Sequence, residues 1–358
     1  AISKGEIDLL QKRVIEADLQ NWLDILRDHT FKTQTIALTR DEASALVVAG
    51  KITLGEIKGV ALSSVEQASL DLLQGKIDDI MRKWDFGGER AQDRRGWFVK
   101  TSRRSPKDAV IVGDRIFELY KRNWQEALDR KRKQKQEAGT LRDDDFHLDE
   151  NAKIIALLQA GRDCLELPHL LCSQIKTAKE AMTLLTSSER VYGDLEAILE
   201  EQPEGTSTLF DCYIVLRQWE HIPIEYEFRC FVNDGRINAI SQYDCLVYFE
   251  SLPPLKPRLQ SAIVAYHATT IQPLLISSGF ASANRYVVDF AFIEGDLARP
   301  TVIELNPFFN ADGCLFNFSK DKAVLEQGPI EFRVNEGLVG AGVKLGLMMQ
   351  WREMLDRV

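Results

Sequence analysis

The chain has 358 residues, of which 45% are hydrophobic and 28% are charged, and its formal net charge is −9 at pH 7. This composition is typical of a globular protein of about two domains and excludes a disordered or fibrous chain. The acidic balance argues against general nucleic-acid binding, which requires a basic surface. Since no apolar run reaches the ~20 residues that cross a bilayer and the first residues lack a secretory hydrophobic segment, we expect no membrane partner and a cytoplasmic location.

The six cysteines are scattered along the chain without any Cys-x-x-Cys pair. This spacing supports neither a structural zinc site nor a disulfide framework. We therefore expect reduced thiols, most of them buried.

The first part of the chain combines helical and strand patterns. Apolar residues recur at helical spacing over 6–28, and 31–38 is typical of a short strand. Thr39 precedes two acidic residues and is predicted to cap a helix, and another helix covers about 63–83. The polar, Gly-rich stretch 85–96 is predicted to be a linker or mobile loop.

The first candidate ligands follow Gly96, where a short strand runs into a loop dense in cations and hydroxyls. Lys100 lies on the strand, and the loop contains Ser102, Arg103, Arg104, Ser105 and Lys107. Such a loop suits phosphate binding, and Pro106 is predicted as the first residue of a following helix. The alternative is a solvated basic turn.

The middle of the chain is highly charged. Residues 115–158 mix both charge signs at helical spacing, which is typical of an exposed helix that ends near Gly139. We assign no chemistry to this segment. Helices are then predicted over 151–164, 177–185 and 191–199.

Strand patterns dominate the region after residue 209. The predicted strands cover 210–219, 226–232 and 236–243, with a hairpin turn at Asn233-Asp234-Gly235. Arg229 is centred in the second strand and requires an anion there, either a carboxylate of the fold or a ligand phosphate. Amphipathic helices are predicted over 258–277 and 338–355.

The clearest candidate site lies in a predicted antiparallel hairpin formed by 286–293 and 300–308. Asp289 interrupts the first apolar strand, while Glu304 and Asn306 are two residues apart and share a face of the second. Three oxygen-bearing side chains on neighbouring strands suit Mg²⁺ shared with nucleotide phosphates. Alternatively, Asp289 pairs with an arginine and the other two line a solvated face of the sheet.

Taken together, these segments resemble the cell division cycle protein 123 family, a divergent ATP-grasp group. The resemblance covers about residues 20–320, and its most specific motifs are Glu227-Phe-Arg-Cys-Phe-Val232, Ile240-Ser-Gln242 and Asn306-Pro-Phe308. The fold class that it implies is α+β, ATP-grasp-like, with two α+β lobes, a nucleotide between them and a charged helical insertion.

The resemblance suggests a division into four parts. These are an N-terminal helical and α+β part over 1–95, a first ATP-grasp lobe over 96–219 with the insertion at about 115–158, a second lobe with the metal hairpin over 220–335, and a C-terminal helix over 336–358.

It also implies roles for individual residues. The nucleotide would be bound by Lys100, Ser102, Lys107, Arg229 and the connector Leu216, Arg217, Gln218 and Trp219. Mg²⁺ would be held by Asp289, Glu304 and Asn306, and the candidate catalytic residues are Arg229 and Asp289.

Three positions depart from the family pattern. Glu304 stands where an aspartate is usual, which keeps the carboxylate but lengthens its reach. Thr186 replaces a frequent lysine, and Tyr243 replaces a frequent arginine. The changes at Thr186 and Tyr243 remove two cations that the family pattern would offer to phosphate.

Members of the family are known as chaperones that bind the γ subunit of eukaryotic translation initiation factor 2 and promote its assembly. The resemblance therefore implies a Mg·ATP-binding chaperone in which ATP organises the lobes by preferential binding. The alternative is an ATP-dependent ligase that works through an acyl phosphate or related intermediate on a peptide, protein or RNA acceptor. The residues leave open whether the protein is an enzyme.

Overall fold

The computed structural model describes residues 16–86, 96–106, 108–109, 115–140, 142, 152–153, 175–201, 210–245, 247–309 and 311–336. Its fold is mixed α+β, as predicted, and the chain divides into two compact units. The β1–β3 unit takes its described residues from Lys32–Ile116 and Gly161–Trp219, and the β4–β8 unit takes its own from Ala1–Phe31, Phe117–Ala160 and Glu220–Val358.

The β1–β3 unit contains a three-stranded antiparallel sheet in the order β1-β3-β2. Its strands are β1 (Thr33–Ala37), β2 (Trp97–Thr101) and β3 (Tyr213–Gln218). Val215 of the central strand faces Thr35 on one side and Lys100 on the other. The three predicted strands are therefore confirmed, and they form one sheet.

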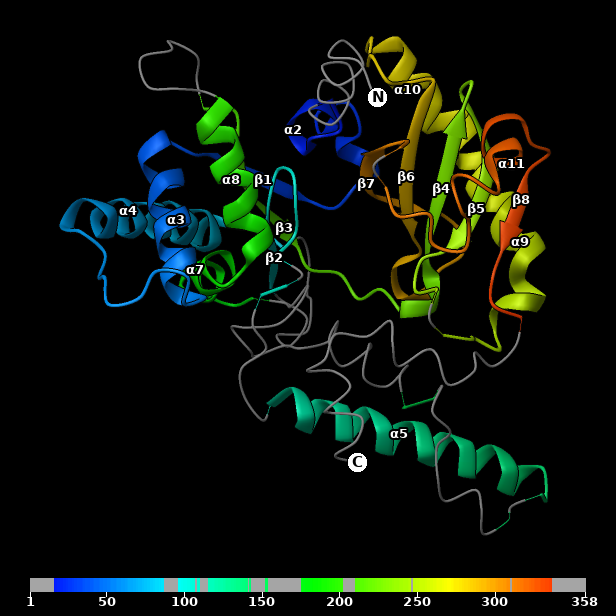
Figure 1. Cartoon of the computed structure of the whole chain (residues 1–358). Coiled ribbons are helices and arrows are strands. Elements are labelled where there is room, and N and C mark those ends of the chain that lie inside the picture. The colour runs from blue at the N-terminus through cyan, green and yellow to red at the C-terminus, as the bar shows by residue number, and fades with distance from the viewer. Residues whose placement is uncertain are drawn as a thin grey trace. The chain divides into compact units, whose positions relative to one another are not determined.

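Helices cover one face of this sheet (Figure 1). They are α3 (Arg40–Thr53), α4 (Ser64–Lys83), α7 (Ala178–Thr186) and α8 (Glu189–Glu201). Val99, Ile214 and Leu216 point to this side and lie in the same apolar core as the buried faces of the helices. Capping boxes begin α3, α4 and α7, and the predicted cap at Thr39 is one of them.

The β4–β8 unit is built on a five-stranded sheet in the order β7-β6-β4-β5-β8. The strands are β4 (Glu227–Asn233), β5 (Arg236–Gln242), β6 (Arg285–Ala291), β7 (Thr301–Pro307) and β8 (Glu331–Arg333). Neighbouring strands pair antiparallel except β8, which runs parallel to β5. Asp234 and Gly235 have φ angles of 50° and 69°, so the predicted hairpin turn is confirmed.

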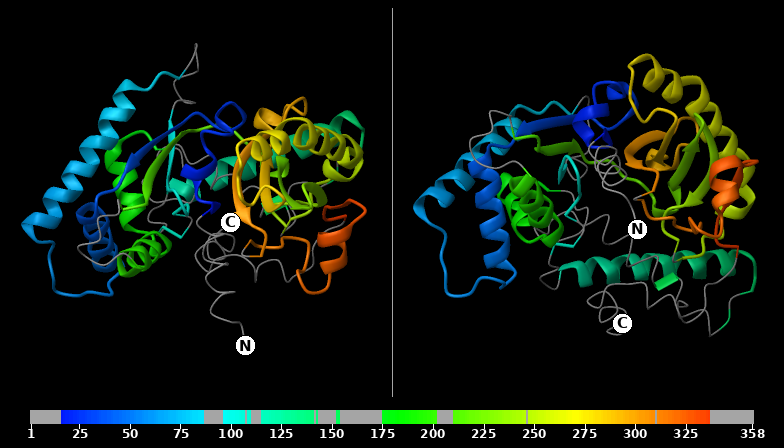
Figure 2. Two further views of the ribbon diagram at one scale, coloured as in Figure 1. Left: turned by 90° about the horizontal axis from the view of Figure 1, so that it is seen from above. Right: turned by 45° about the horizontal axis from the view of Figure 1, so that its top comes forward.

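A helix interrupted by one π-helical turn runs along one face of this sheet (Figure 2). It comprises α9 (Leu252–Tyr266), the π-helical turn η5 (His267–Ile271) and α10 (Gln272–Ser277). The helix was predicted from residue 258, but it begins at Leu252. Pro253 and Pro254 fit its first turn because backbone N–H groups there have no partner within the helix.

The remaining described elements are short, except for α5. They are α2 (Leu19–Trp22), η1 (Arg27–His29), α5 (Arg115–Glu137), η4 (Ile224–Tyr226), η6 (Ile293–Gly295) and α11 (Lys322–Gln327). The predicted end of the charged helix is confirmed, since α5 stops two residues before Gly139, whose φ is 67°. Predictions for 6–15, for most of 85–96 and 143–174, and for 338–355 lie outside the described residues.

The predicted helix start at Pro106 is wrong. Pro106 accepts a hydrogen bond from the backbone N–H of Ala109 at 3.1 Å, which closes a single turn. Asp108 explains the difference because its carboxylate accepts from Ser188 Oγ at 2.5 Å and from the Arg190 N–H at 2.8 Å. The segment is thereby fixed to the N-terminus of α8, where a carboxylate is favourable.

Among the described residues, no helix combines the length and apolarity needed to cross a membrane. The described cysteines are all free thiols, as predicted. Cys212 and Cys230 are buried, whereas Cys245 and Cys314 are half-buried.

Stability should fall in mild acid because of His267. Its Nε2 lies 2.8 Å from Tyr286 Oη, and Tyr286 donates to Gln272 Oε1 at 3.0 Å, all in buried surroundings. Burial lowers the pKa of His267 to about 4 from 6.5, so the unfolded chain binds a proton first as the pH falls. We expect the free energy of unfolding to drop by on the order of 3 kcal/mol between pH 7 and 4.

The measurement is urea unfolding across this pH range for the unsubstituted protein and for His267→Gln. The variant lacks the titrating imidazole, so its stability should depend less steeply on pH. Parallel profiles for the two proteins would show that His267 is not responsible.

Candidate functional site

A row of polar side chains crosses the five-stranded sheet from edge to edge. Strand register pairs Glu304 of β7 with Asp289 of β6, Asp289 with Arg229 of β4, Arg229 with Ser241 of β5, and Ser241 with Arg333 of β8. Residues paired in this way point to the same face of a sheet. We call these five residues the polar row.

The centre of the polar row is a bidentate ion pair. Arg229 Nε donates to Asp289 Oδ1 at 2.8 Å, and Arg229 Nη2 donates to Asp289 Oδ2 at 2.7 Å. The two side chains are only 6% and 1% exposed. Of the two anions that the sequence left open for Arg229, the structure therefore places a carboxylate of the fold beside it.

Burial shifts the pKa values of both partners. Burial raises the pKa of Asp289 to about 6, while the charge and hydrogen bonds of Arg229 act in the opposite direction. Burial is the largest single influence on the pKa of Arg229 and lowers it, but the charge and the hydrogen bonds of Asp289, with smaller contributions from Tyr243 and Cys314, together outweigh burial and the net shift is upward. Arg229 is consequently a permanent cation in the middle of the sheet.

The three predicted metal ligands meet at the β7 end of the polar row. Asn306 Nδ2 lies 3.3 Å from both Asp289 Oδ2 and Glu304 Oε1. Glu304 and Asn306 are half-buried on the edge strand, whereas Asp289 is buried behind them. The Asn306 NH₂ group lies between two carboxylates, at a point where positive charge is favourable. A cation site requires such a point.

The donor set fits a magnesium ion shared with a ligand. Reversing the Asn306 amide, whose two ends are assigned from hydrogen bonding, would present its oxygen to the same point. Within the described part of the chain, no group of three or more His, Cys, Asp or Glu side chains could hold a metal. An ion between Glu304 and Asn306 would therefore need water or phosphate oxygens as further ligands, which is the usual state of protein-bound Mg²⁺.

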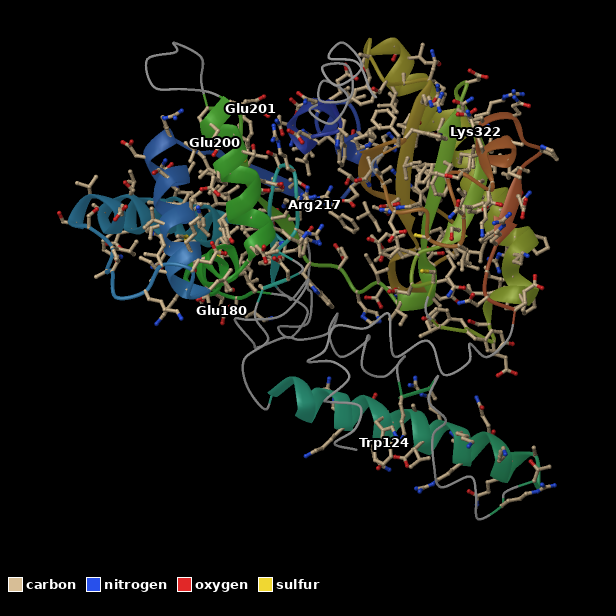
Figure 3. All side chains as sticks on the ribbon, in the orientation of Figure 1. Trp124, Glu180, Glu200, Glu201, Arg217 and Lys322 are labelled. Carbon is tan, nitrogen blue, oxygen red and sulfur yellow. The ribbon has the colours of Figure 1, made fainter. Side chains whose placement is uncertain are left out.

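The predicted cations of the β1–β3 unit lie on the sheet face away from the helices. Arg217, labelled in Figure 3, is on β3. It is in register with Thr33 and Phe98, and Lys100 is in register with Val215. Arg217 Nε donates to Thr33 Oγ1 at 3.3 Å. Lys100 and Arg217 are each 3% exposed, so the structure brings both cations to one buried face of this unit.

The other predicted connector residues point elsewhere. Leu216 belongs to the apolar core beneath the helices, and Gln218 Oε1, also on that face, lies 3.5 Å from Trp84 Nε1. Trp219 is half-buried and donates its backbone N–H to Gly96 O at 3.0 Å. Any contact of Leu216 or Gln218 with a ligand on the opposite face would have to come from their backbone.

The loop after β2 is held to β3 by Ser102. Its backbone N–H donates to Tyr213 O at 2.8 Å, and its hydroxyl accepts from the Tyr213 N–H at 3.3 Å. Arg104 forms an ion pair with Asp194 of α8 at 2.9 Å. Lys107 lies outside the described residues.

Two of the residues that depart from the family pattern, Tyr243 and Thr186, make local contacts in the structure. Tyr243 lies with its ring centre 5.0 Å from the guanidinium carbon of Arg229, so an aromatic face adjoins the central cation. The Thr186 hydroxyl donates to Met182 O at 2.9 Å within α7.

Arg333 was not among the residues selected from the sequence. It lies on a strand of three residues that pairs with a distant strand, so no alternation pattern marks it. Ser241 was part of a recognised motif but had no assigned role. Its position in the polar row becomes apparent only from the β4–β5 register.

The residues of the polar row lie in a part of the chain that matches a known protein family. A family model described as D123 matches residues 167–338, which is just under half of the chain. These residues resemble the D123 family. The predicted resemblance is thereby confirmed, and every member of the polar row, with Asn306, lies in the D123 region.

Several relatives cover a similar share of the chain. A protein of Sclerotinia sclerotiorum named "Translation initiation factor eIF2 assembly protein" is 32% identical over 173 residues, or 47% of this chain and 38% of the relative. A Candida albicans protein of the same name is 32% identical over 40% of this chain and 41% of the relative. "Cell division cycle protein 123" of Candida glabrata is 31% identical over 42% of this chain and 40% of the relative. The matches thus span well under half of these relatives.

A solved structure, Cdc123 from Schizosaccharomyces pombe, resembles the chain more extensively. The superposition has a TM-score of 0.52 and covers 91% of this chain and 98% of that structure, at 19% sequence identity. At this identity the similarity concerns the fold alone.

Removing only one partner of the central ion pair should be severely destabilising. Arg229→Met leaves the Asp289 carboxylate buried without its cation, which should cost about 3–5 kcal/mol of unfolding free energy. In Arg229→Met/Asp289→Leu no unpaired charge remains, and most of that loss should be recovered. Urea unfolding measures both.

Arg285→Ala serves as the control because the Arg285–Glu326 pair lies at 2.7 Å in the same unit but is 40% and 25% exposed. It should cost less than about 1 kcal/mol. Equal losses for the single and double variants at position 229 would contradict the assigned role of the pair.

Proposed function

We propose that the polar row binds the Mg²⁺ ion and phosphates of ATP, and that the protein uses the bound nucleotide in the assembly of translation initiation factor eIF2. Two observations support the proposal. The polar row lies entirely in the D123 region, and relatives with similarity to this chain are named eIF2 assembly proteins.

The proposal that the polar row binds Mg·ATP rests on one observation. Asp289, Glu304 and Asn306 converge beside Arg229. Glu304 and Asn306 would provide the protein oxygens for the ion, and Asp289 would keep Arg229 in place next to them. Bound Mg²⁺ would neutralise phosphate charge. Arg229 is oriented by two hydrogen bonds to Asp289 before any ligand arrives, so no rotamer entropy is lost on binding.

The ATP-grasp classification belongs to the same proposal, since the five-stranded sheet of the β4–β8 unit places carboxylate, amide and guanidinium groups on one face. Phosphate contacts from Lys100, Ser102 and Lys107, and contacts beside the adenine from the connector Leu216, Arg217, Gln218 and Trp219, stay predictions.

The assembly role requires binding rather than turnover. A ligand that binds only the organised state stabilises it by about 2.7 kcal/mol when its concentration is 100 times Kd. ATP would thus favour the conformation that binds the partner, for which the γ subunit of the factor is the expected component. The ligase alternative also stays a prediction, and the product analysis below distinguishes the two.

The Mg·ATP site is tested by calorimetry. Glu304→Ala and Asn306→Ala each remove an oxygen ligand on the edge strand, so each should weaken binding of ATP in excess Mg²⁺ by about tenfold or more. Thr301→Ala, on the same strand and also half-buried, is the matched control and should leave Kd unchanged. Failure of the unsubstituted protein to bind ATP, or equal binding by all four proteins, would refute the site.

The assembly role is tested by reconstitution. Purified eIF2 subunits should associate faster when the protein, ATP and Mg²⁺ are present, and Asn306→Ala should reduce this effect in proportion to its weaker ATP binding. ADP, AMP and phosphate should not accumulate in proportion to complex formed. Stoichiometric release of these products together with a covalent adduct would instead establish a ligase.

A further inference from the structure

A segment from Asp312 to Asp321 lies against the polar row, and we call it the strap. Arg229 Nη1 donates to Asp312 O at 3.0 Å, and Ser241 Oγ accepts from the Leu315 N–H at 3.1 Å. Arg333 Nη1 donates to Leu315 O at 3.1 Å. Three successive members of the polar row therefore each hold the backbone of the strap.

Arg333 fixes the strap at more than one point. Beyond Leu315, its Nη2 and Nη1 donate to Asp321 Oδ1 and Oδ2 at 2.8 and 3.0 Å. Its guanidinium carbon also lies 4.1 Å from the centre of the Phe316 ring. The hydrogen bonds from Arg333 lower the pKa of Asp321, so the pair stays charged near neutral pH.

The strap has little freedom to take another path. Phe316 donates its backbone N–H to Gly313 O at 2.9 Å, and a Cβ atom at position 313 would lie only 2.1 Å from Phe316 O. Cys314 has a φ of 51°, in the left-handed region. Phe316 and Phe318 pack with ring centres 5.7 and 5.8 Å from Phe231, which anchors the strap to the sheet independently of Arg333.

The Asp312 carbonyl is the part of the strap that reaches the candidate site. Asp289 accepts from Nε and Nη2 of Arg229, and Asp312 O accepts from Nη1. The guanidinium plane is thus fixed from two directions, by the neighbouring strand and by the strap. A strap displaced by about an ångström would release the second of them.

We infer that Arg333 is a positioning residue for the nucleotide site: by holding Leu315 and Asp321 it fixes the Asp312 carbonyl, which orients Arg229 toward the phosphates. This inference rests on the proposed binding of Mg·ATP. Arg333 itself contacts neither the predicted metal ligands nor, in this scheme, the nucleotide. Its effect reaches the site only through the strap and Arg229.

The test compares Arg333→Ala with Arg285→Ala. Arg285 is a close match because it also forms an ion pair, with Glu326, and lies 4.6 Å from an aromatic ring centre, that of Phe308, in the same unit. Arg333→Ala should raise the Kd for Mg·ATP by about tenfold, as for residues that orient a ligand-binding group, while Arg285→Ala leaves it within about twofold. Arg333→Lys keeps a donor for Leu315 O and should recover part of the affinity.

Amide hydrogen exchange supplies a readout that general destabilisation would not reproduce. Arg333→Ala should accelerate exchange over 312–318 while the central strands stay protected, whereas Arg285→Ala should leave the strap unchanged. Gly313→Ala displaces the same turn but leaves Arg333 unchanged. Like Arg333→Ala, it should accelerate amide exchange in the strap and weaken Mg·ATP binding.

The outcomes separate the two proposals. If the unsubstituted protein binds no Mg·ATP, the proposed function is refuted and the positioning role with it. If it binds, but Arg333→Ala and Gly313→Ala retain full affinity or Arg285→Ala loses as much, only the positioning role is overturned.

Discussion

The structure depends above all on one buried pair of opposite charges, Arg229 and Asp289. Each is tolerable in the middle of a five-stranded sheet only because the other neutralises it. The pair also specifies the sheet, since a one-residue slip of β4 against β6 would turn Arg229 to the opposite face and leave Asp289 alone. Folding in the correct register and assembling the candidate site are therefore the same event.

The pair also explains why side chains so far apart in sequence meet at one candidate site. β6 separates β4 from the edge strand, so Asp289 contacts Arg229 on one side and the Asn306 amide on the other. A change in charge on the edge strand β7 would therefore act on Arg229 through the Asp289 carboxylate. The strap adds a second contact to Arg229, so the guanidinium is restrained before any ligand binds.

The sequence was sufficient for the parts of the site that depend on local pattern. A carboxylate in an apolar strand identified Asp289, and two-residue spacing placed Glu304 and Asn306 together. Which anion meets Arg229 could not be predicted, because the register of two strands separated by more than 50 residues is set by tertiary packing. For the same reason Arg333 could not be identified from the sequence. At Pro106 the local sequence predicts a helix start, but the contact of Asp108 with α8 determines the structure instead.

The position of β7 at the edge of its sheet has a consequence for how this site can change over evolutionary time. Asp289 and Arg229 belong to inner strands, where a replacement disturbs two neighbours, whereas Glu304 and Asn306 have a neighbouring strand on one side only. A replacement of Glu304 or Asn306 is therefore expected to disturb the sheet less than a replacement of Asp289 or Arg229. Glu304, which the family resemblance sets against an aspartate, is the kind of variation that such an arrangement permits.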